Sequence, residues 1–269
     1  MHTPVLLQQA IEKLNVKADG RYIDATFGEG GYSSEISKKG GLVLGIDLDI
    51  SQIQNHKSKI PNLELVQGNF ADIEAIAKAN NFFPVDGVVF DLGLSMRQLN
   101  ESGRGLSYKR FNEPLDMRID QTIKTTAKDL IKGLSAEKLY DVLAKNSEEL
   151  KSKEIAYEIK YRRKMETVDD LIKAIDKAVG YTSSSVYSRI FQALRIAVNN
   201  EFDNLKRGLI GAVKIIKPEG RIVIVTFHSL EDRIVKNFAR ENKLEFLEKK
   251  PVKGERSFER SAKLRVIKV

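Results

Sequence analysis

The chain contains no cysteine among its 269 residues, which excludes disulfide bonds, thiolate nucleophiles and thiolate metal sites. It also lacks any uncharged apolar run of about 18 residues, the length that a membrane-spanning helix needs. The N-terminal segment has neither the charged region nor the apolar stretch of a secretory signal. We therefore expect a cytoplasmic protein that makes no membrane contact.

Acidic residues are outnumbered by basic ones, and the formal net charge is +8 at pH 7. An excess of Lys and Arg favours a polyanionic partner, because binding to phosphates releases condensed counterions. The basic residues gather in Lys160–Lys164 and in the segment from Lys249 to the C-terminus, where eight basic residues accompany two acidic ones. The sequence leaves two interpretations open, a nucleic-acid contact or a well-solvated surface.

Short apolar runs alternate with helix-like spacers in the N-terminal part of the chain. The runs are rich in Val and Ile and are bounded by Gly, Pro, Asp or Asn, which predicts buried parallel strands in βαβ units. Three of these runs are followed by Asp24, Asp47 and Asp91. Ligands of open α/β sheets bind beyond the carboxyl ends of the strands, so these three carboxylates are candidate site residues.

Helical signals dominate the middle of the chain. Ser135 is a predicted helix N-cap, and Thr167 followed by Asp170 has the spacing of a capping box. A long helical stretch is predicted from about Val186 to Ile216, ended by Pro218 and Gly220. The alternating strand pattern then returns near the C-terminus. We predict an α/β core at 1–104 and 186–269 with an all-helical inserted domain at 105–185.

A glycine-rich turn, Gly28-Glu-Gly-Gly31, follows the first predicted strand. Such a turn lets the backbone approach a ligand closely, because glycine tolerates positive φ and has no Cβ. The turn lacks the Lys-Ser/Thr pair of a P-loop, and Ser33 occupies the third glycine position of the dinucleotide fingerprint. A tight connection without a ligand is the alternative interpretation.

Two carboxylates favour a particular ligand for this turn. Asp47, 17 positions after Gly30, ends the next predicted strand, where a carboxylate can accept both hydroxyls of a ribose. Asp24 precedes the turn, where it can hold the loop amides or contact a cation. A carboxylate at this position suits the sulfonium and amino groups of S-adenosylmethionine better than a pyrophosphate.

The chain resembles the cytosine-N4 methyltransferases of bacterial small-subunit ribosomal RNA, the MraW or RsmH family. The resemblance rests on motifs that occur in the family's order along nearly the whole chain. These motifs are His2–Leu7, Asp24–Gly31, Asp91–Ser95 with Gln98, Arg104–Tyr108, Pro114–Arg118, Arg189–Ile196, Val198–Glu201, Phe227–Lys236 and Arg260–Arg265. The resemblance implies a class I methyltransferase fold, in which a Rossmann-like α/β core with a mainly parallel, seven-stranded sheet carries an inserted helical domain. It also implies methylation of N4 of one cytidine in the decoding centre of 16S rRNA, in the small ribosomal subunit, with S-adenosylmethionine as cofactor.

The same resemblance implies the residues that contact the methyl donor. Carried over by motif position, they are Gly30, Gly31 and Tyr32 in the loop, Asp47 at the ribose, Phe70 beside the adenine, and Asp91 and Gln98 near the reacting end. The family usually has histidine in place of Tyr32 and a second serine in place of Met96. Tyr32 can still contact the donor through its backbone. The segment between Lys236 and Arg260 is short for the family.

Asp91 and His228 are the candidate catalytic residues. Asp91 can accept a hydrogen bond from the target amino group and favour the positive charge that develops on it; its alternative role is to hold the turn at Gly93. His228 follows the last large strand and can position the base, accept a proton, or hold its loop. Ser229 is the predicted cap of the following helix.

Several questions stay open at this point. Arg104, Arg118, Arg189 and Arg195 are candidates for RNA phosphates, and each can instead pair with a carboxylate. The alternative functions are methylation of DNA or protein, a non-catalytic RNA-binding or ribosome-assembly factor, and, least favoured, a nicotinamide oxidoreductase. Nothing in the sequence requires a metal. A homodimer is a hypothesis that the sequence does not decide.

Overall fold

The computed structural model describes residues 4–49, 60–254, 256 and 259–269; the start of the His2–Leu7 motif lies outside them. The chain forms two compact units, Met1–Gly93 with Phe202–Val269, called here the sheet unit, and Leu94–Glu201, called the helical unit. These boundaries differ from the predicted 104/105 and 185/186. The helix over Ser184–Asn199 explains much of the difference, since its apolar face belongs to the core of the helical unit.

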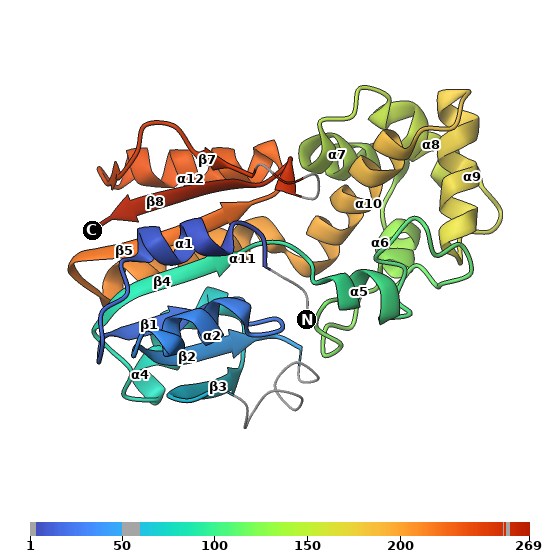
Figure 1. The fold of residues 1–269 in the computed structure, drawn as a ribbon. Coiled ribbons are helices and arrows are strands. Elements are labelled where there is room, and N and C mark those ends of the chain that lie inside the picture. The colour runs from blue at the N-terminus through green and yellow to red at the C-terminus, as the bar shows by residue number, and fades with distance from the viewer. Residues whose placement is uncertain (1–3, 50–59, 255, 257–258) are drawn as a thin grey trace. The chain divides into compact units, whose positions relative to one another are not determined.

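Eight strands among the described residues form one sheet in the sheet unit, in the order β3-β2-β1-β4-β5-β8-β6, with β7 also paired to β8 (Figure 1). The strands are β1 Arg21–Asp24, β2 Leu42–Asp47, β3 Leu63–Gln67, β4 Val85–Asp91, β5 Ile216–Thr226, β6 Glu245–Phe246, β7 Val252–Lys253 and β8 Lys263–Lys268. The first five pair in parallel, and β8 runs antiparallel to β5. The mainly parallel α/β sheet is thus confirmed. The sheet has eight strands where seven were predicted, and two of them, β6 and β7, are two residues long and pair with β8.

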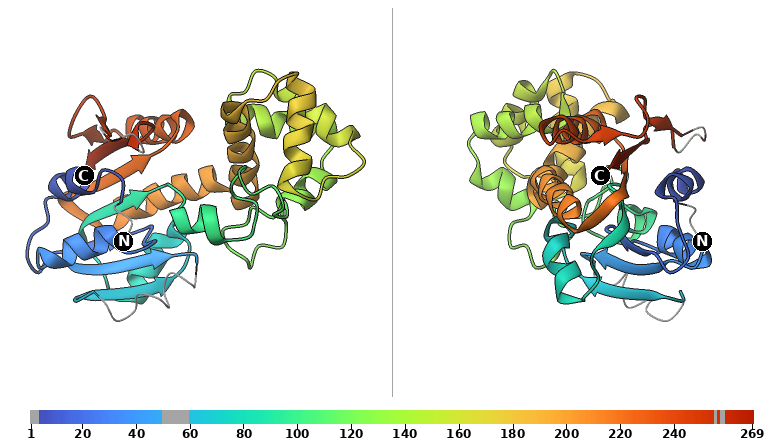
Figure 2. Two further views of the ribbon diagram at one scale, coloured as in Figure 1. Left: turned by 45° about the vertical axis from the view of Figure 1, so that its right-hand side comes forward. Right: turned by 90° about the vertical axis from the view of Figure 1, so that its left-hand side faces the viewer.

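Helices cover both faces of this sheet (Figure 2). They are α1 Leu7–Leu14, α2 Gly31–Lys38, α4 Ile73–Ala79, α11 Glu201–Ile215 and α12 Ser229–Glu241, with a 3-10 turn at Phe70–Asp72. One core packs α1 and α2 against one face, and a second core packs α4, α11 and α12 against the other. Because both faces are buried, β2 and β4 are apolar almost throughout rather than alternating.

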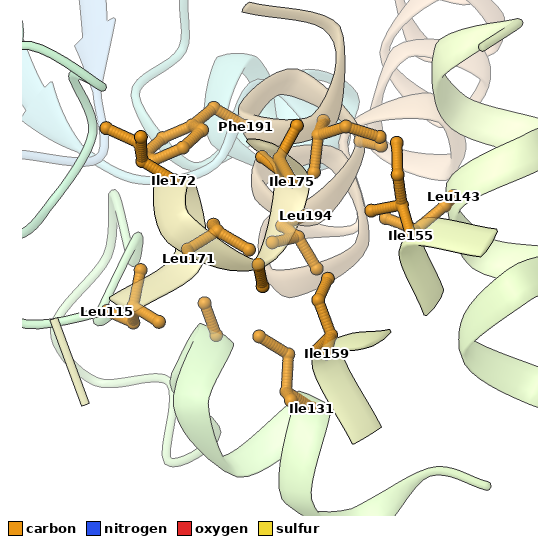
Figure 3. Packing of buried hydrophobic residues seen from close by; sticks show 14 of the residues in the cluster. Leu115, Ile131, Leu143, Ile155, Ile159, Leu171, Ile172, Ile175, Phe191 and Leu194 are labelled. Carbon is orange, nitrogen blue, oxygen red and sulfur yellow. The ribbon is translucent and has the colours of Figure 1, made fainter. Parts of the chain in front are cut away.

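The helical unit has its own apolar core (Figure 3). Its helices are α5 Met96–Glu101, α6 Ala127–Gly133, α7 Ala136–Ser147, α8 Ser152–Tyr161, α9 Val168–Val179 and α10 Ser184–Asn199. Fully buried side chains such as Ile155, Leu171 and Leu194 come from three different helices and meet in this core. The predicted caps are confirmed, since the Ser135 hydroxyl accepts from the Lys138 amide and Thr167 with Asp170 forms a capping box.

The helical stretch predicted from Val186 to Ile216 is confirmed, and it consists of two helices rather than one. It divides into α10 and α11 at Asn200, whose backbone is left-handed (φ 52°) and whose amide donates to the Ile196 carbonyl. Asparagine tolerates this conformation better than most residues, so it can end a helix in the middle of an otherwise continuous apolar pattern. Strand β5 begins at Ile216, before Pro218. Among the described residues, no helix has both the length and the apolar character that crossing a membrane would require.

Candidate functional site

Three of the predicted site carboxylates end neighbouring strands of the sheet unit. Asp24 is the last residue of β1, Asp47 of β2 and Asp91 of β4. These strands pair in parallel in the order β2-β1-β4, so their carboxyl ends meet at one edge of the sheet. The structure therefore brings the three side chains to the edge that the sequence indicated.

Asp24 is completely buried and holds the glycine loop in place. Its carboxylate accepts the Ser33 hydroxyl at 2.7 Å, the Ser33 amide at 3.2 Å and the Thr26 amide at 3.4 Å. Burial raises the pKa of this carboxyl to about 6, and the hydrogen bonds from Ser33 and Thr26 oppose the rise. Of the two roles open for Asp24, the structure shows the loop-holding one; contact with a cationic ligand stays a prediction.

Asp47 connects the second strand to the same loop. Its Oδ2 accepts the Gly28 amide at 2.7 Å and its Oδ1 accepts the Asp49 amide at 2.8 Å. Burial raises its pKa to about 6. Gly28 itself has a positive φ of 53°, and a Cβ added there would meet only the Thr26 carbonyl oxygen, at 3.8 Å. The backbone at Gly28 thus faces open space. A ligand can approach a loop closely only where the backbone is open in this way.

The next two glycines are required by packing. A Cβ on Gly30 would lie 2.7 Å from the Phe27 ring, and one on Gly31 would lie 2.0 Å from Cγ of Pro4. Gly30 also has a positive φ of 75° as the residue before α2. Tyr32 is buried, and its hydroxyl donates to the Val5 carbonyl. Donor contacts from this part of the loop stay predictions, and they would have to come from the backbone.

Phe70 and Gln98, which were predicted to contact the donor, each contact other residues of the protein. The Phe70 ring packs edge-on against Phe90, with centroids 5.7 Å apart, and remains partly exposed. Gln98 belongs to the helical unit, where it forms a capping box with Ser95 at the start of α5. The predicted contacts of both residues with a donor stay predictions.

Asp91 has an unmet hydrogen-bonding capacity. Its backbone amide donates to the Thr26 hydroxyl at 2.7 Å, which fixes the end of β4 beside the glycine loop. Its side-chain Oδ1, by contrast, is shut off from water and has no hydrogen-bond partner. Burial raises the pKa of this carboxyl to about 7; an amide hydrogen bond from Gly93 opposes the rise, and the charge of Asp24 adds to it. A buried carboxylate oxygen without a hydrogen-bond partner destabilises the protein. A ligand that donates a hydrogen bond to this oxygen offsets that cost.

His228 is the N-cap of α12, a place that the sequence assigned to Ser229. Its Nδ1 accepts the Glu231 amide at 3.4 Å, and the Glu231 carboxylate accepts the amides of Phe227, at 2.8 Å, and His228, at 3.4 Å. The prediction for Ser229 is wrong because an imidazole nitrogen can replace a hydroxyl as the capping acceptor. Nε2 of His228 is buried without a hydrogen-bond partner, although Glu231 Oε1 lies 3.1 Å away.

Glu231 is a site residue that the sequence-based prediction missed. It is buried, it holds the loop that carries His228, and its charge contributes to the raised pKa of Asp91. Its position three residues after a capping residue is the signal that could have identified it.

The site as a whole favours a cation. Asp24, Asp47 and Asp91 each have a pKa raised by burial, so each pays a desolvation cost when ionised. A positively charged ligand beside them relieves that cost. Contacts of Gly28, Asp47 and Asp91 with such a ligand stay predictions.

Arginines that were candidates for RNA phosphates pair within the helical unit. Arg118 holds Asp116 through two hydrogen bonds of 2.7 and 2.8 Å, Nε of Arg189 donates to Glu149 at 2.9 Å, and Arg195 holds Glu201 at 2.8 and 3.0 Å. Arg104 donates to the Ile119 carbonyl at 2.9 Å. Likewise, Lys160 donates to the carbonyls of Ile131 and Lys132 near the end of α6. For these side chains the structure supports the alternative of internal pairing.

The chain is similar to known methyltransferases. Residues 1–268 match the family model described as the MraW methylase family. A ribosomal RNA small subunit methyltransferase H of Cytophaga hutchinsonii is 39% identical over 249 residues, 90% of this chain and 83% of that protein. The protein of the same name from Carboxydothermus hydrogenoformans is 40% identical over 256 residues, 89% and 80% of the two chains. Among solved structures, a methyltransferase homologue from Pyrococcus horikoshii aligns with a TM-score of 0.48 and 12% identity, over 99% of this chain and 67% of that one.

Proposed function

The chain belongs to the MraW methylase family, and we propose that it methylates N4 of one cytidine in the decoding centre of 16S rRNA. It is a methyltransferase of the class I α/β type with S-adenosylmethionine as methyl donor. The substrate is the rRNA of the small ribosomal subunit, as the names of its relatives state for those proteins. The proposal places the reaction in the cytoplasm.

The observation that carries the proposal is the orphaned Oδ1 of Asp91. N4 of cytidine is a poor nucleophile because its lone pair is delocalised into the pyrimidine ring. A carboxylate that accepts a hydrogen bond from the N4 amino group holds it in one orientation and stabilises the positive charge that develops on nitrogen during methyl transfer. Asp91 has this free acceptor at the end of β4, beside the glycine loop.

Neighbouring residues would hold the donor in line with that amine. Asp47 would accept the ribose hydroxyls, and the backbone at Gly28 would approach the donor from the loop. Asp24 would hold the glycine-rich loop against the donor through its hydrogen bond with Ser33. The donor supplies an electrophilic methyl group on a sulfonium, and the carboxylates of the site favour its positive charge.

Asp91 is also suited to take part in the removal of the proton. Methylation leaves N4 with a positive charge, which is lost when a proton leaves the nitrogen. Burial raises the pKa of Asp91 to about 7 in the ligand-free protein, which brings it close to the neutral pH at which a general base works best. Asp91 can therefore orient the amine before the transfer and accept a proton after it.

The Asp91→Asn variant tests this role. The amide keeps the shape of the side chain but cannot balance a positive charge or take the proton, so kcat should fall by about 10²- to 10⁴-fold. The assay follows transfer of labelled methyl groups to small subunits that lack the modification. Asp86→Asn is a matched control, because Asp86 lies on the same strand and pairs with Lys217.

Three results would contradict the proposal at different levels. Full turnover by Asp91→Asn would remove the catalytic role of Asp91 and leave the methyltransferase assignment intact. Failure of the unaltered protein to label small subunits, with labelling of DNA or protein instead, would overturn the proposed substrate. Absence of donor binding in calorimetry would favour a non-catalytic RNA-binding factor.

A further inference from the structure

Two buried side-chain atoms of the described sheet unit lack a hydrogen-bond partner, and both lie at the carboxyl edge of the sheet. They are Oδ1 of Asp91 and Nε2 of His228. Asp91 ends β4 and pairs in register with Val225 of the adjacent strand β5, and His228 follows Val225 by three residues. The Leu92 amide also donates to the Val225 carbonyl, at 3.1 Å, so the two strand ends are tied together.

The hydrogen on His228 can be assigned from its contacts. Nδ1 accepts the amide hydrogen of Glu231, so it carries no hydrogen itself, and the neutral imidazole must carry its hydrogen on Nε2. Nε2 is therefore a donor that makes no hydrogen bond of its own, although Glu231 Oε1 lies 3.1 Å away. Oδ1 of an ionised Asp91 is an acceptor without a donor. The pair presents one acceptor at the end of β4 and one donor two residues beyond the end of the adjacent strand β5.

We infer that Asp91 and His228 together recognise the N4–N3 edge of the target cytosine, with His228 as the residue that determines base specificity. This inference rests on the proposed function. Cytosine presents a hydrogen-bond donor at N4 and an acceptor at N3, the complement of the two unmet atoms. Uracil presents an acceptor at O4 and a donor at N3, the reverse pattern. His228 donates to N3, while Asp91 accepts from N4.

Aromatic side chains stand around the same place. The Phe202 ring lies 5.9 Å from the His228 ring, and both Phe202 and Phe227 are partly exposed. The Phe227 ring lies against Gly93, where an added Cβ would be only 2.7 Å from it. A base taken out of its stack is held by such rings while its Watson–Crick edge is hydrogen-bonded.

The capping contacts give His228 a fixed orientation. Nδ1 of His228 accepts the Glu231 amide, so the imidazole cannot turn without breaking the cap, and the buried Glu231 side chain holds the Phe227 and His228 amides. Both unmet atoms are shut off from water, so leaving them without a partner costs free energy. The two hydrogen bonds that the base then completes offset part of this cost.

The test uses 3-deazacytidine, in which a C–H group replaces N3 and the N4 amine is kept. Small subunits are reconstituted with 16S rRNA that carries either cytidine or 3-deazacytidine at the target position. The unaltered protein should lose about tenfold or more in kcat/KM on the 3-deaza substrate, because the His228 donor is left unpaired. His228→Asn keeps an N-cap acceptor but cannot reach N3, so its ratio between the two substrates should fall to about one.

His228→Gln carries an amide donor at nearly the reach of Nε2 and should restore part of the preference for cytidine. Since each ratio is measured within one variant, a change in folding stability cancels. The inference is overturned if His228→Asn discriminates between the two substrates as strongly as the unaltered protein does. It is also overturned if the unaltered protein methylates both equally. If the unaltered protein failed to methylate the cytidine substrate, that result would instead contradict the proposed function.

Discussion

The site depends on three buried or partly buried carboxylates, whose positions the sequence predicted but whose hydrogen-bond partners it did not. Asp24, Asp47 and Asp91 could be predicted because each follows an apolar run that becomes a buried strand. That Asp24 is fully engaged by Ser33 and Thr26, and that Asp91 has one unmet oxygen, depends on side-chain geometry. Likewise, only the folded loop shows that His228, and not Ser229, caps α12.

Donor affinity should depend on pH because of these carboxylates. Their pKa values of about 6, 6 and 7 are raised in the free protein, and a cationic donor favours the ionised form. Binding therefore releases protons: affinity is full above about pH 7 and falls as the pH drops through 7 and 6, by up to about tenfold per pH unit for each proton released. Calorimetry in buffers of different ionisation enthalpy measures both the dissociation constant of the donor and the number of protons released on binding.

The Asp91→Asn variant is the control for that measurement. Removing the group with the highest pKa should flatten the upper part of the pH profile and leave the part near pH 6. A dissociation constant that stays the same between about pH 5.5 and 8, with no proton release, would contradict this account of the site.

At the scale of elements, the strands and capped helices were predictable from local patterns, whereas the end of α10 was not. The apolar pattern continues from Val186 to Ile216 without interruption. The break at Asn200 follows from its left-handed backbone, and the preceding Asn199 is held by contacts distant in sequence, at 2.7 Å from the Ile119 amide and 2.8 Å to the Met117 carbonyl. Such non-local contacts leave no periodic signal.

One buried ion pair ties α12 to the sheet, and its loss should be costly. Asp232 accepts Nε of Arg265 at 2.5 Å, and both residues are buried. Burial opposes ionisation of Asp232, but hydrogen bonding and the charge of Arg265 outweigh it and lower its pKa. Asp232→Asn should reduce the free energy of unfolding by about 3–5 kcal/mol near neutral pH, as measured by urea unfolding.

An exposed pair offers the matched control. Lys268 lies 2.6 Å from Glu219, which is 76% exposed, so Glu219→Gln should change the free energy of unfolding by less than about 0.5 kcal/mol. Because the pKa of Asp232 is lowered, its contribution should be present above the usual carboxyl range and be lost as the pH falls below it. Equal effects of the two substitutions at neutral pH would show that the pair between α12 and β8 is not important for stability.

For the whole molecule, the sequence predicted a mainly parallel sheet with a helical insertion, and it was least accurate at the boundaries. The helical unit spans Leu94–Glu201 rather than 105–185, since a domain boundary is set by which core a helix packs into. The family membership of the chain follows from motifs distributed over its whole length. The target nucleotide, in contrast, is determined by an RNA that is not part of the chain.

The most direct test of the central claim is to map the methylated nucleotide. Small subunits lacking the modification are incubated with the protein and labelled S-adenosylmethionine, and the rRNA is digested and analysed by mass spectrometry. The account predicts one added methyl group, on N4 of a single cytidine in the decoding centre of 16S rRNA. Absence of label from the rRNA, or a methyl group on another base or another atom, would contradict it.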